Sequence, residues 1–217
     1  MESYKNIYYP KENNSAVVKA LLSNRIWEKK IDKIMRDNIK PEWICIDAGA
    51  YIGSHALTMS KLCKEVHLFE PQPLIYNCLL KTKEALGIKN WYINNYALMN
   101  YDNGLIEFCS NNDGDARVMR STFRRNWKYH LKVKTMKLDA HFAEIKKVNF
   151  IKIDVEGSEF ELLNGAKGII TRDRPLIILE TFVSKKNEFL LNEFLSNYNY
   201  SAEKINSENW FLTPVVN

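Results

Sequence analysis

Apolar residues in the first forty positions recur at spacings of three and four, which is the period of one face of an α-helix. The residues of this stripe are Val17, Val18, Leu21, Leu22, Ile26, Trp27, Ile31, Ile34 and Met35. Ser15 stands where a helix N-cap is expected, and the region of Pro41 ends the pattern. Residues 1–40 are therefore predicted to form a helical preface that packs on the main domain or covers one side of its binding site.

After residue 40 the pattern changes to short apolar runs that alternate with amphipathic stretches. The runs typical of buried strands are 43–47, 65–70, 91–98, 148–154 and 175–181. Two segments, 104–108 and 131–138, alternate polar and apolar residues and predict a more exposed pair of strands. Helices are predicted at 54–64, from Pro71 to Gly87, at 158–172 and at 185–197, with further strands at 200–205 and 209–213.

Strands that alternate with helices predict a doubly wound α/β fold with a parallel sheet. The 217 residues are enough for one such domain, so we expect a single domain over 1–217, with a Rossmann-like core at 41–217. Ligands of these sheets bind at the carboxyl ends of the strands. The residues that end the five buried strands are Asp47, Glu70, Asn95, Asp154 and Glu180. Four of the five are acids, which indicates a functional site there.

The turn after the first buried strand, residues 47–54, contains two glycines but does not fit a dinucleotide. Tyr51 occupies the position where a glycine must let the backbone approach a pyrophosphate. Asp47 would repel a phosphate but suits an ammonium group, and S-adenosyl-methionine carries an amino group, a sulfonium and no phosphate. Glu70 lies at the spacing where an acid binds ribose hydroxyls. The alternative is a nucleotide-free domain with a structural glycine turn.

Four segments together resemble the FkbM family of S-adenosyl-methionine-dependent methyltransferases. They are ICIDAGAYIGSHAL, LFEPQP, FIKIDVEGSEFELLNGA and RPLIILET, and the resemblance runs from about Pro41 to Thr181. It implies the class I methyltransferase fold, a seven-stranded, mostly parallel sheet with helices on both faces. It also implies sugar hydroxyls, in glycans or glycosylated metabolites, as methyl acceptors.

The same resemblance implies which residues bind the cofactor. The turn that holds the methionine portion comprises Asp47, Gly49, Ala50, Tyr51 and Gly53. Glu70, followed by Pro71, would bind the ribose, and the segment Asn95, Tyr96 and Ala97 would lie near the adenine. Tyr51 departs from the family, which usually has a small polar residue there, and we expect it to reshape the rim of the pocket.

Catalysis of O-methylation requires a group that takes or orients the proton of the attacking hydroxyl. Asp154 is the first candidate and Glu180 the second, and both are expected at the sulfonium side of the cofactor. His55 is a third candidate base, although such a histidine more often caps or packs. Glu156 and Glu159 follow closely in sequence, and Glu159 suits the first turn of a helix.

A metal-dependent mechanism is a further hypothesis. Asp154 and Glu180, together with Thr181 and water molecules, would suit Mg²⁺, which prefers oxygen ligands. Cysteines 45, 63, 78 and 109 form no C-x-x-C pair and are expected to be buried, reduced thiols. His67 alternates into a strand and is expected to be structural.

The net charge of +5 is less informative than its distribution. Residues 116–137 contain no acid and eight basic residues: Arg117, Arg120, Arg124, Arg125, Lys128, Lys132, Lys134 and Lys137. This stretch is either a solvated face or a rim that holds an anionic or hydroxyl-rich acceptor. Three aromatic residues, Trp127, Tyr129 and Trp210, either stack on sugar rings or pack in the core.

Two alternatives to a sugar methyltransferase follow from these features. A nucleic-acid methyltransferase would use the basic stretch to hold phosphates. Against this alternative, residues 153–156 lack the motif of amino-methylating DNA enzymes, and residues 180–181 lack the lysine of ribose-methylating enzymes. The other alternative is a non-catalytic module that binds the cofactor, but the strand-end acids are all retained.

The chain shows no targeting or membrane signal. The first fourteen residues lack the apolar region of a secretory signal, and no apolar run approaches the ~20 residues that span a bilayer. We therefore expect a soluble, cytoplasmic protein without a membrane span. No sequence pattern specifies an oligomeric state.

Overall fold

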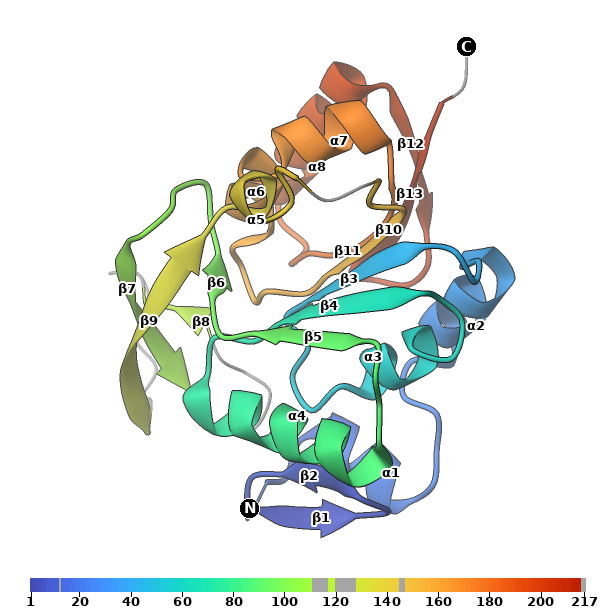
Figure 1. Cartoon of the computed structure of the whole chain (residues 1–217). Coiled ribbons are helices and arrows are strands. Elements are labelled where there is room, and N and C mark those ends of the chain that lie inside the picture. The colour runs from blue at the N-terminus through green and yellow to red at the C-terminus, as the bar shows by residue number, and fades with distance from the viewer. Residues whose placement is uncertain (12, 111–116, 120–127, 145–146, 216–217) are drawn as a thin grey trace.

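The computed structural model describes residues 1–11, 13–110, 117–119, 128–144 and 147–215. Its strands are β1 Glu2–Tyr4, β2 Ile7–Tyr9, β3 Ile44–Ala48, β4 Glu65–Phe69, β5 Trp91–Asn94, β6 Ala97–Leu98, β7 Leu105–Ser110, β8 Arg117–Val118, β9 Tyr129–Met136, β10 Phe150–Ile153, β11 Leu176–Glu180, β12 Tyr200–Lys204 and β13 Asn209–Pro214. Its helices are α1 Ala16–Leu22, α2 Lys29–Asn38, α3 Ser54–Met59, α4 Pro73–Leu86, α5 Leu138–His141, α6 Glu159–Asn164, α7 Lys167–Asp173 and α8 Lys185–Tyr198. Figure 1 shows their arrangement.

A seven-stranded sheet forms the centre of the fold, in the order β12-β13-β11-β10-β3-β4-β5. Strands β11, β10, β3, β4 and β5 pair in parallel, and β13 runs antiparallel to both of its neighbours. Helices α5 to α8 cover one face, while α2, α3 and α4 cover the other (Figure 1). The two apolar clusters of the core lie on these two faces. The predicted fold, a mostly parallel α/β sheet with helices on both faces, is confirmed.

A second sheet of order β6-β9-β7-β8 stands beside the carboxyl ends of the main strands. The predicted exposed pair is its centre, because β7 and β9 pair antiparallel over their length. The prediction of one strand over 91–98 was wrong. The chain bends at Asn95 and Tyr96, so β5 completes the main sheet and β6 joins β9 in the second one.

The N-terminal preface is also different from the prediction of one continuous helix. It begins with the antiparallel hairpin β1–β2 and continues with two separate helices, α1 and α2. Ser15 is the N-cap of α1, as predicted, and its side chain accepts a hydrogen bond from the Val18 amide. The helix breaks before α2, where Glu28 has the left-handed φ of 44°. The apolar stripe continues across this break because both helices turn apolar residues inward, which is why its period did not reveal two elements.

Two predicted helices are shorter than expected. The helix after the glycine turn ends at Met59, and the helix predicted over 158–172 is divided into α6 and α7. Gly165 lies at the division, where a Cβ atom would be 2.1 Å from the Met99 carbonyl oxygen. Only glycine therefore fits this close approach.

The four cysteines are free and buried, which confirms the expectation of reduced thiols. His67 is also structural, because its ring stacks on Tyr92 at 4.8 Å and packs against Phe142. Burial lowers the pKa of His67 to about 4. None of the helices in the described part of the chain is long and apolar enough to cross a membrane.

Candidate active site

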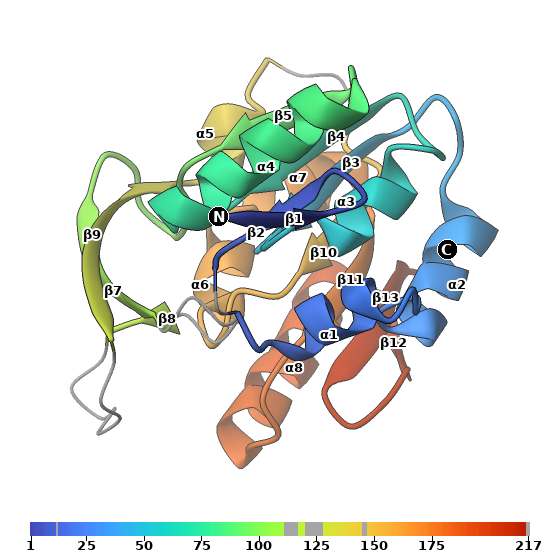
Figure 2. The same ribbon diagram turned by 90° about the horizontal axis from the view of Figure 1, so that it is seen from below.

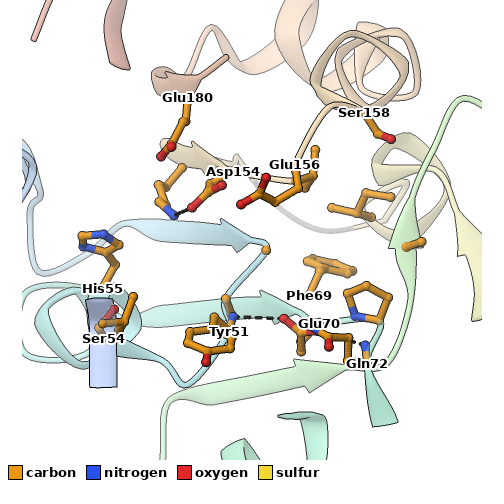
Figure 3. A pocket seen from close by; sticks show the side chains of 18 of the residues that line it. Tyr51, Ser54, His55, Phe69, Glu70, Gln72, Asp154, Glu156, Ser158 and Glu180 are labelled. Atoms are coloured by element: carbon orange, nitrogen blue, oxygen red, sulfur yellow. Dashed lines mark hydrogen bonds and ion pairs between the residues drawn. The ribbon is translucent and has the colours of Figure 1, made fainter. Parts of the chain in front are cut away.

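A cavity of about 280 Å³ lies at the carboxyl ends of β3, β4, β10 and β11 (Figure 3). Ten of the residues predicted for the site line it: Gly49, Ala50, Tyr51, His55, Glu70, Pro71, Tyr96, Ala97, Asp154 and Glu180. The structure thus brings together residues that are up to 131 positions apart, from Gly49 to Glu180. The N-terminal preface forms part of the wall through Ser15, Ala16, Val17, Trp27 and Glu28. The sequence did not predict Trp27 and Glu28 as site residues; they lie at the break between α1 and α2, where Glu28 has a left-handed conformation.

Three predicted cofactor residues do not line the cavity. Asp47 lies beneath the glycine turn with an exposed fraction of 1%, and neither of its carboxylate oxygens has a hydrogen-bond partner among the described residues. Burial raises its pKa. Gly53 packs against the Trp91 ring. The Asn95 side chain donates to the carbonyl oxygens of Glu70 and Pro71, so it fixes the loop behind the cavity rather than facing it.

The glycine turn is tight because three strand ends meet there. Gly49 has a φ of +80°, and a Cβ atom on it would lie 1.7 Å from the Asp154 carbonyl oxygen. Its amide and that of Ala50 both donate to the Phe69 carbonyl oxygen at the end of β4. A side chain at position 49 would therefore push β10 away from β3.

Glu70 follows β4 and is held in place by backbone amides. Its carboxylate accepts hydrogen bonds from the amides of Tyr51, at 3.1 Å, and Gln72, at 2.9 Å. Burial raises its pKa to about 7, although these two hydrogen bonds act in the opposite direction. The carboxylate lines the cavity beside the glycine turn, where it can accept further hydrogen bonds from ligand hydroxyls (Figure 3).

Asp154 is ion-paired with a buried lysine that the sequence analysis did not select. The Lys152 ammonium lies 2.9 Å from Asp154 Oδ2, and the exposed fractions of the two side chains are 3% and 27%. In the register of the sheet Lys152 is opposite Asp47 of β3 and Ile178 of β11. Side chains two residues apart on a strand share a face, so Glu180 lies on the same side. The signal in the sequence was a lysine in the middle of the apolar run FIKI.

This arrangement balances one buried cation against several carboxylates. Burial lowers the pKa of Lys152, but Asp154, Asp47 and Glu180 together raise it above its ordinary value. The surroundings of Glu180 disfavour its ionised form. Burial and the charge of Asp154 raise its pKa to about 8, and the charge of Lys152 offsets only part of this increase. Near neutral pH, Glu180 can therefore exchange a proton.

His55 and Glu159 are engaged in local contacts. His55 Nε2 is 2.9 Å from Glu28 Oε2, which joins α3 to the start of α2 at the cavity wall. The Glu159 carboxylate accepts a hydrogen bond from the Gly157 amide at the start of α6, in keeping with the role in the first helical turn considered for it. Burial raises the pKa of Glu159 to about 7.

The residues considered for Mg²⁺ do not fit a divalent ion. Asp154 already binds the Lys152 ammonium, and the raised pKa of Glu180 favours its protonated form at neutral pH. Thr181 Oγ1 accepts a hydrogen bond from the Asn187 side chain. Within the described residues, no group of three or more His, Cys, Asp or Glu side chains is arranged to hold a metal.

The described members of the basic stretch lie outside the cavity. Lys132 and Lys134 border an adjacent groove, which shares Pro71 and Tyr96 with the cavity. The Lys204 ammonium lies 5.1 Å from the centre of the Trp210 ring, which also packs against the core. Neither Trp210 nor Tyr129 lines the cavity. Arg120, Arg124, Arg125 and Trp127 fall outside the described residues.

Comparison with known proteins agrees with this geometry. The Methyltransferase FkbM domain matches residues 47–202. No curated protein sequence matches the chain. Among solved structures, a methyltransferase FkbM from Methylobacillus flagellatus has a TM-score of 0.58 at 14% identity, covering 91% of this chain and 52% of its own. The chain thus spans about half the length of that relative.

Two shorter structures are similar over almost their whole length. An rRNA methylase from Streptococcus thermophilus has a TM-score of 0.56 at 14% identity, with 86% of this chain and 95% of the other covered. A protein from Streptococcus mutans, solved in complex with SAH, has a TM-score of 0.54 at 12% identity, with 85% and 94% covered. These likenesses show the class I methyltransferase fold. Because the family match extends over most of the sequence, the chain belongs to the FkbM family of S-adenosyl-methionine-dependent methyltransferases.

Proposed function

We propose that the cavity binds S-adenosyl-methionine and that the protein transfers the methyl group to a hydroxyl of a glycan or sugar-bearing metabolite. The observation that carries this proposal is the convergence of strand-end carboxylates on one cavity beside a glycine turn. Five acids line the cavity, Glu28, Glu70, Asp154, Glu156 and Glu180, against one lysine among the described residues. Such a cavity suits a cationic cofactor and an acceptor that donates hydrogen bonds.

The chain's residues divide between the parts of the cofactor. Glu70 would accept hydrogen bonds from the ribose hydroxyls, and the turn Gly49 to Tyr51 would lie along the methionine portion. The Asp47 carboxyl group, buried just before that turn, would favour an amino group near it. Tyr96 and Ala97, after β5, would border the adenine.

At the other end of the cavity, Asp154 and Glu180 would act on the acceptor. The sequence favours Asp154 as the base, but its ion pair with Lys152 makes it the weaker proton acceptor. We therefore assign proton acceptance to Glu180 and orientation of the hydroxyl to Asp154. The hydroxyl oxygen forms the bond to the methyl carbon while the carbon–sulfur bond breaks, and Glu180 takes the proton. Alignment of oxygen, carbon and sulfur supplies much of the acceleration.

The charges of the cavity favour this acceptor class over nucleic acid. Phosphates bind to clusters of lysine and arginine, which neutralise them. The cavity instead presents carboxylates, and Lys132 and Lys134 of the basic stretch border an adjacent groove rather than the cavity itself. A sugar hydroxyl can donate a hydrogen bond to a carboxylate without a cost in charge repulsion.

The test is transfer of a labelled methyl group from S-adenosyl-methionine to a panel of sugars, oligosaccharides and, as the alternative, RNA. We expect a labelled methyl ether on a sugar, with kcat/KM rising as pH increases through about 8. We expect kcat/KM to rise with pH because Glu180 must lose its own proton before it can accept the proton of the hydroxyl.

Glu180→Gln should lower kcat by at least about 100-fold and remove the pH dependence near 8, because the amide cannot accept the proton. Glu193→Gln is the matched control, since Glu193 is exposed on α8 and lies outside the cavity. Transfer to RNA alone would contradict the acceptor class, and full activity of Glu180→Gln would contradict the assigned base.

A further inference from the structure

Tyr51 joins the glycine turn to the N-terminal preface. Its hydroxyl donates to Ser15 Oγ at 3.2 Å and accepts a hydrogen bond from the Asn13 side chain. Asn13 also accepts from the Ser15 amide, at 2.9 Å, and Ser15 caps α1. The hydroxyl therefore meets a small, preorganised group of polar atoms at the start of α1.

The backbone of Tyr51 is held in a costly conformation at this point. Its φ is +48°, a left-handed value that is rare for a residue with a bulky side chain. The hydrogen bond from its amide to Glu70 fixes this conformation. Strain of this kind persists where the surroundings require it, commonly at ligand sites. Here it directs the tyrosine ring from the glycine turn to the preface.

The segment that Tyr51 contacts forms one wall of the cavity. Residues 13–28 run from the hairpin beside α4, through α1, to the start of α2 (Figure 2). Ser15, Ala16, Val17, Trp27 and Glu28 of this segment line the cavity. At its far end, Glu28 contacts His55 on α3. The wall is thus fastened by polar contacts at both ends of the cavity.

Between these ends the wall has few apolar anchors. Its cluster has three buried residues, Tyr9, Val18 and Ile52, with Val17 and Leu21 of the wall packed against them, and is separate from the two clusters of the main core. The flanking parts are anchored independently: the Tyr8 amide donates to Thr82 on α4, and Ile31 of α2 is buried in the core. Local opening of the wall would expose little apolar surface, so it requires far less free energy than global unfolding.

We propose that Tyr51 is a positioning residue that fastens the wall of residues 13–28 over the cofactor through its hydroxyl and so sets how long the cofactor stays bound. This inference rests on the proposed binding of S-adenosyl-methionine in the cavity. It also gives a role to the one residue of the turn that departs from the family pattern. In the closed position, the hydroxyl and the Glu28–His55 contact hold the wall from opposite ends.

The test measures dissociation of S-adenosyl-homocysteine by stopped-flow or surface plasmon resonance. Tyr51→Phe keeps the ring and removes both hydrogen bonds, so we expect the dissociation rate constant to rise about tenfold. Tyr200→Phe is the matched control, because the Tyr200 hydroxyl donates to the Pro175 carbonyl oxygen and neither residue belongs to the wall or lines the cavity. Hydrogen exchange should report faster exchange at residues 15–22 in Tyr51→Phe only.

A second variant keeps the inference testable if the aromatic substitution disturbs the turn. Asn13→Ala should also raise the dissociation rate, and the double variant with Tyr51→Phe should dissociate about as fast as Tyr51→Phe alone, because the contact between Asn13 and Tyr51 is already lost in that single variant. A dissociation rate of Tyr51→Phe within twofold of the wild type would overturn the inference. Absence of binding to the wild type would instead overturn the proposed function.

Discussion

Replacement of Gly49 with alanine is expected to lower the free energy of unfolding by about 3 kcal/mol or more and to abolish cofactor binding. The new Cβ would lie 1.7 Å from the Asp154 carbonyl oxygen, which is backbone and cannot rotate away. The left-handed φ of +80° adds about 1–2 kcal/mol of conformational strain to the cost of the clash. Relief of the clash must separate β3 from β10 where the cavity begins. Urea unfolding and calorimetry with S-adenosyl-homocysteine measure the two effects.

Gly87→Ala separates the clash from the strain. Gly87 also has a left-handed φ, of +61°, at the end of α4, but no atom lies within 4 Å of the position of its Cβ. We expect a loss of only about 1 kcal/mol and unchanged cofactor binding. Equal losses in the two variants would show that the close approach at Gly49 does not exist.

Lys152→Met is expected to lower the free energy of unfolding by about 3–5 kcal/mol, the usual cost of removing one partner of a buried ion pair. Methionine has a similar length, so packing changes little, but Asp154, Asp47 and Glu180 lose the cation that faces them. The variant should also lose methyl transfer, because Asp154 is no longer fixed at the cavity. Urea unfolding at neutral pH measures the stability.

An exposed lysine of similar geometry provides the comparison. Lys33 lies 2.8 Å from Asp37 on α2, but the exposed fractions of the two side chains are 75% and 55%. Lys33→Met should therefore change the free energy of unfolding by less than about 1 kcal/mol. If Lys152→Met proves no more costly than Lys33→Met, the buried ammonium does not stabilise the strand-end acids.

Much of the main sheet could be predicted because its strands are short apolar runs. The runs that became β3, β4, β10 and β11 each end next to an acid, and the rule that ligands bind at carboxyl ends predicts a site at this edge of the sheet. Glu70 and Asp154 both line the cavity at these strand ends. The glycine turn was located by its two glycines, although only Gly49 faces the cavity.

The parts that the sequence did not predict depend on contacts between distant segments. The hairpin β1–β2 is short and partly exposed, so it leaves little hydrophobic pattern. The break before α2 depends on the left-handed conformation of Glu28, which no residue type there signals. Lys152 looked like an interruption of an apolar strand, because two of its three acidic neighbours, Asp47 and Glu180, come from other strands.

The central claim is tested most directly by calorimetric titration of S-adenosyl-homocysteine into the wild type, Glu70→Ala and Glu65→Ala. Glu65 is the matched control because it begins β4, at the opposite end of the strand from the cavity. We predict micromolar binding to the wild type and to Glu65→Ala, and at least about 100-fold weaker binding to Glu70→Ala, which loses the hydrogen bonds to the ribose. Failure of the wild type to bind, or equal binding by Glu70→Ala, would contradict the account.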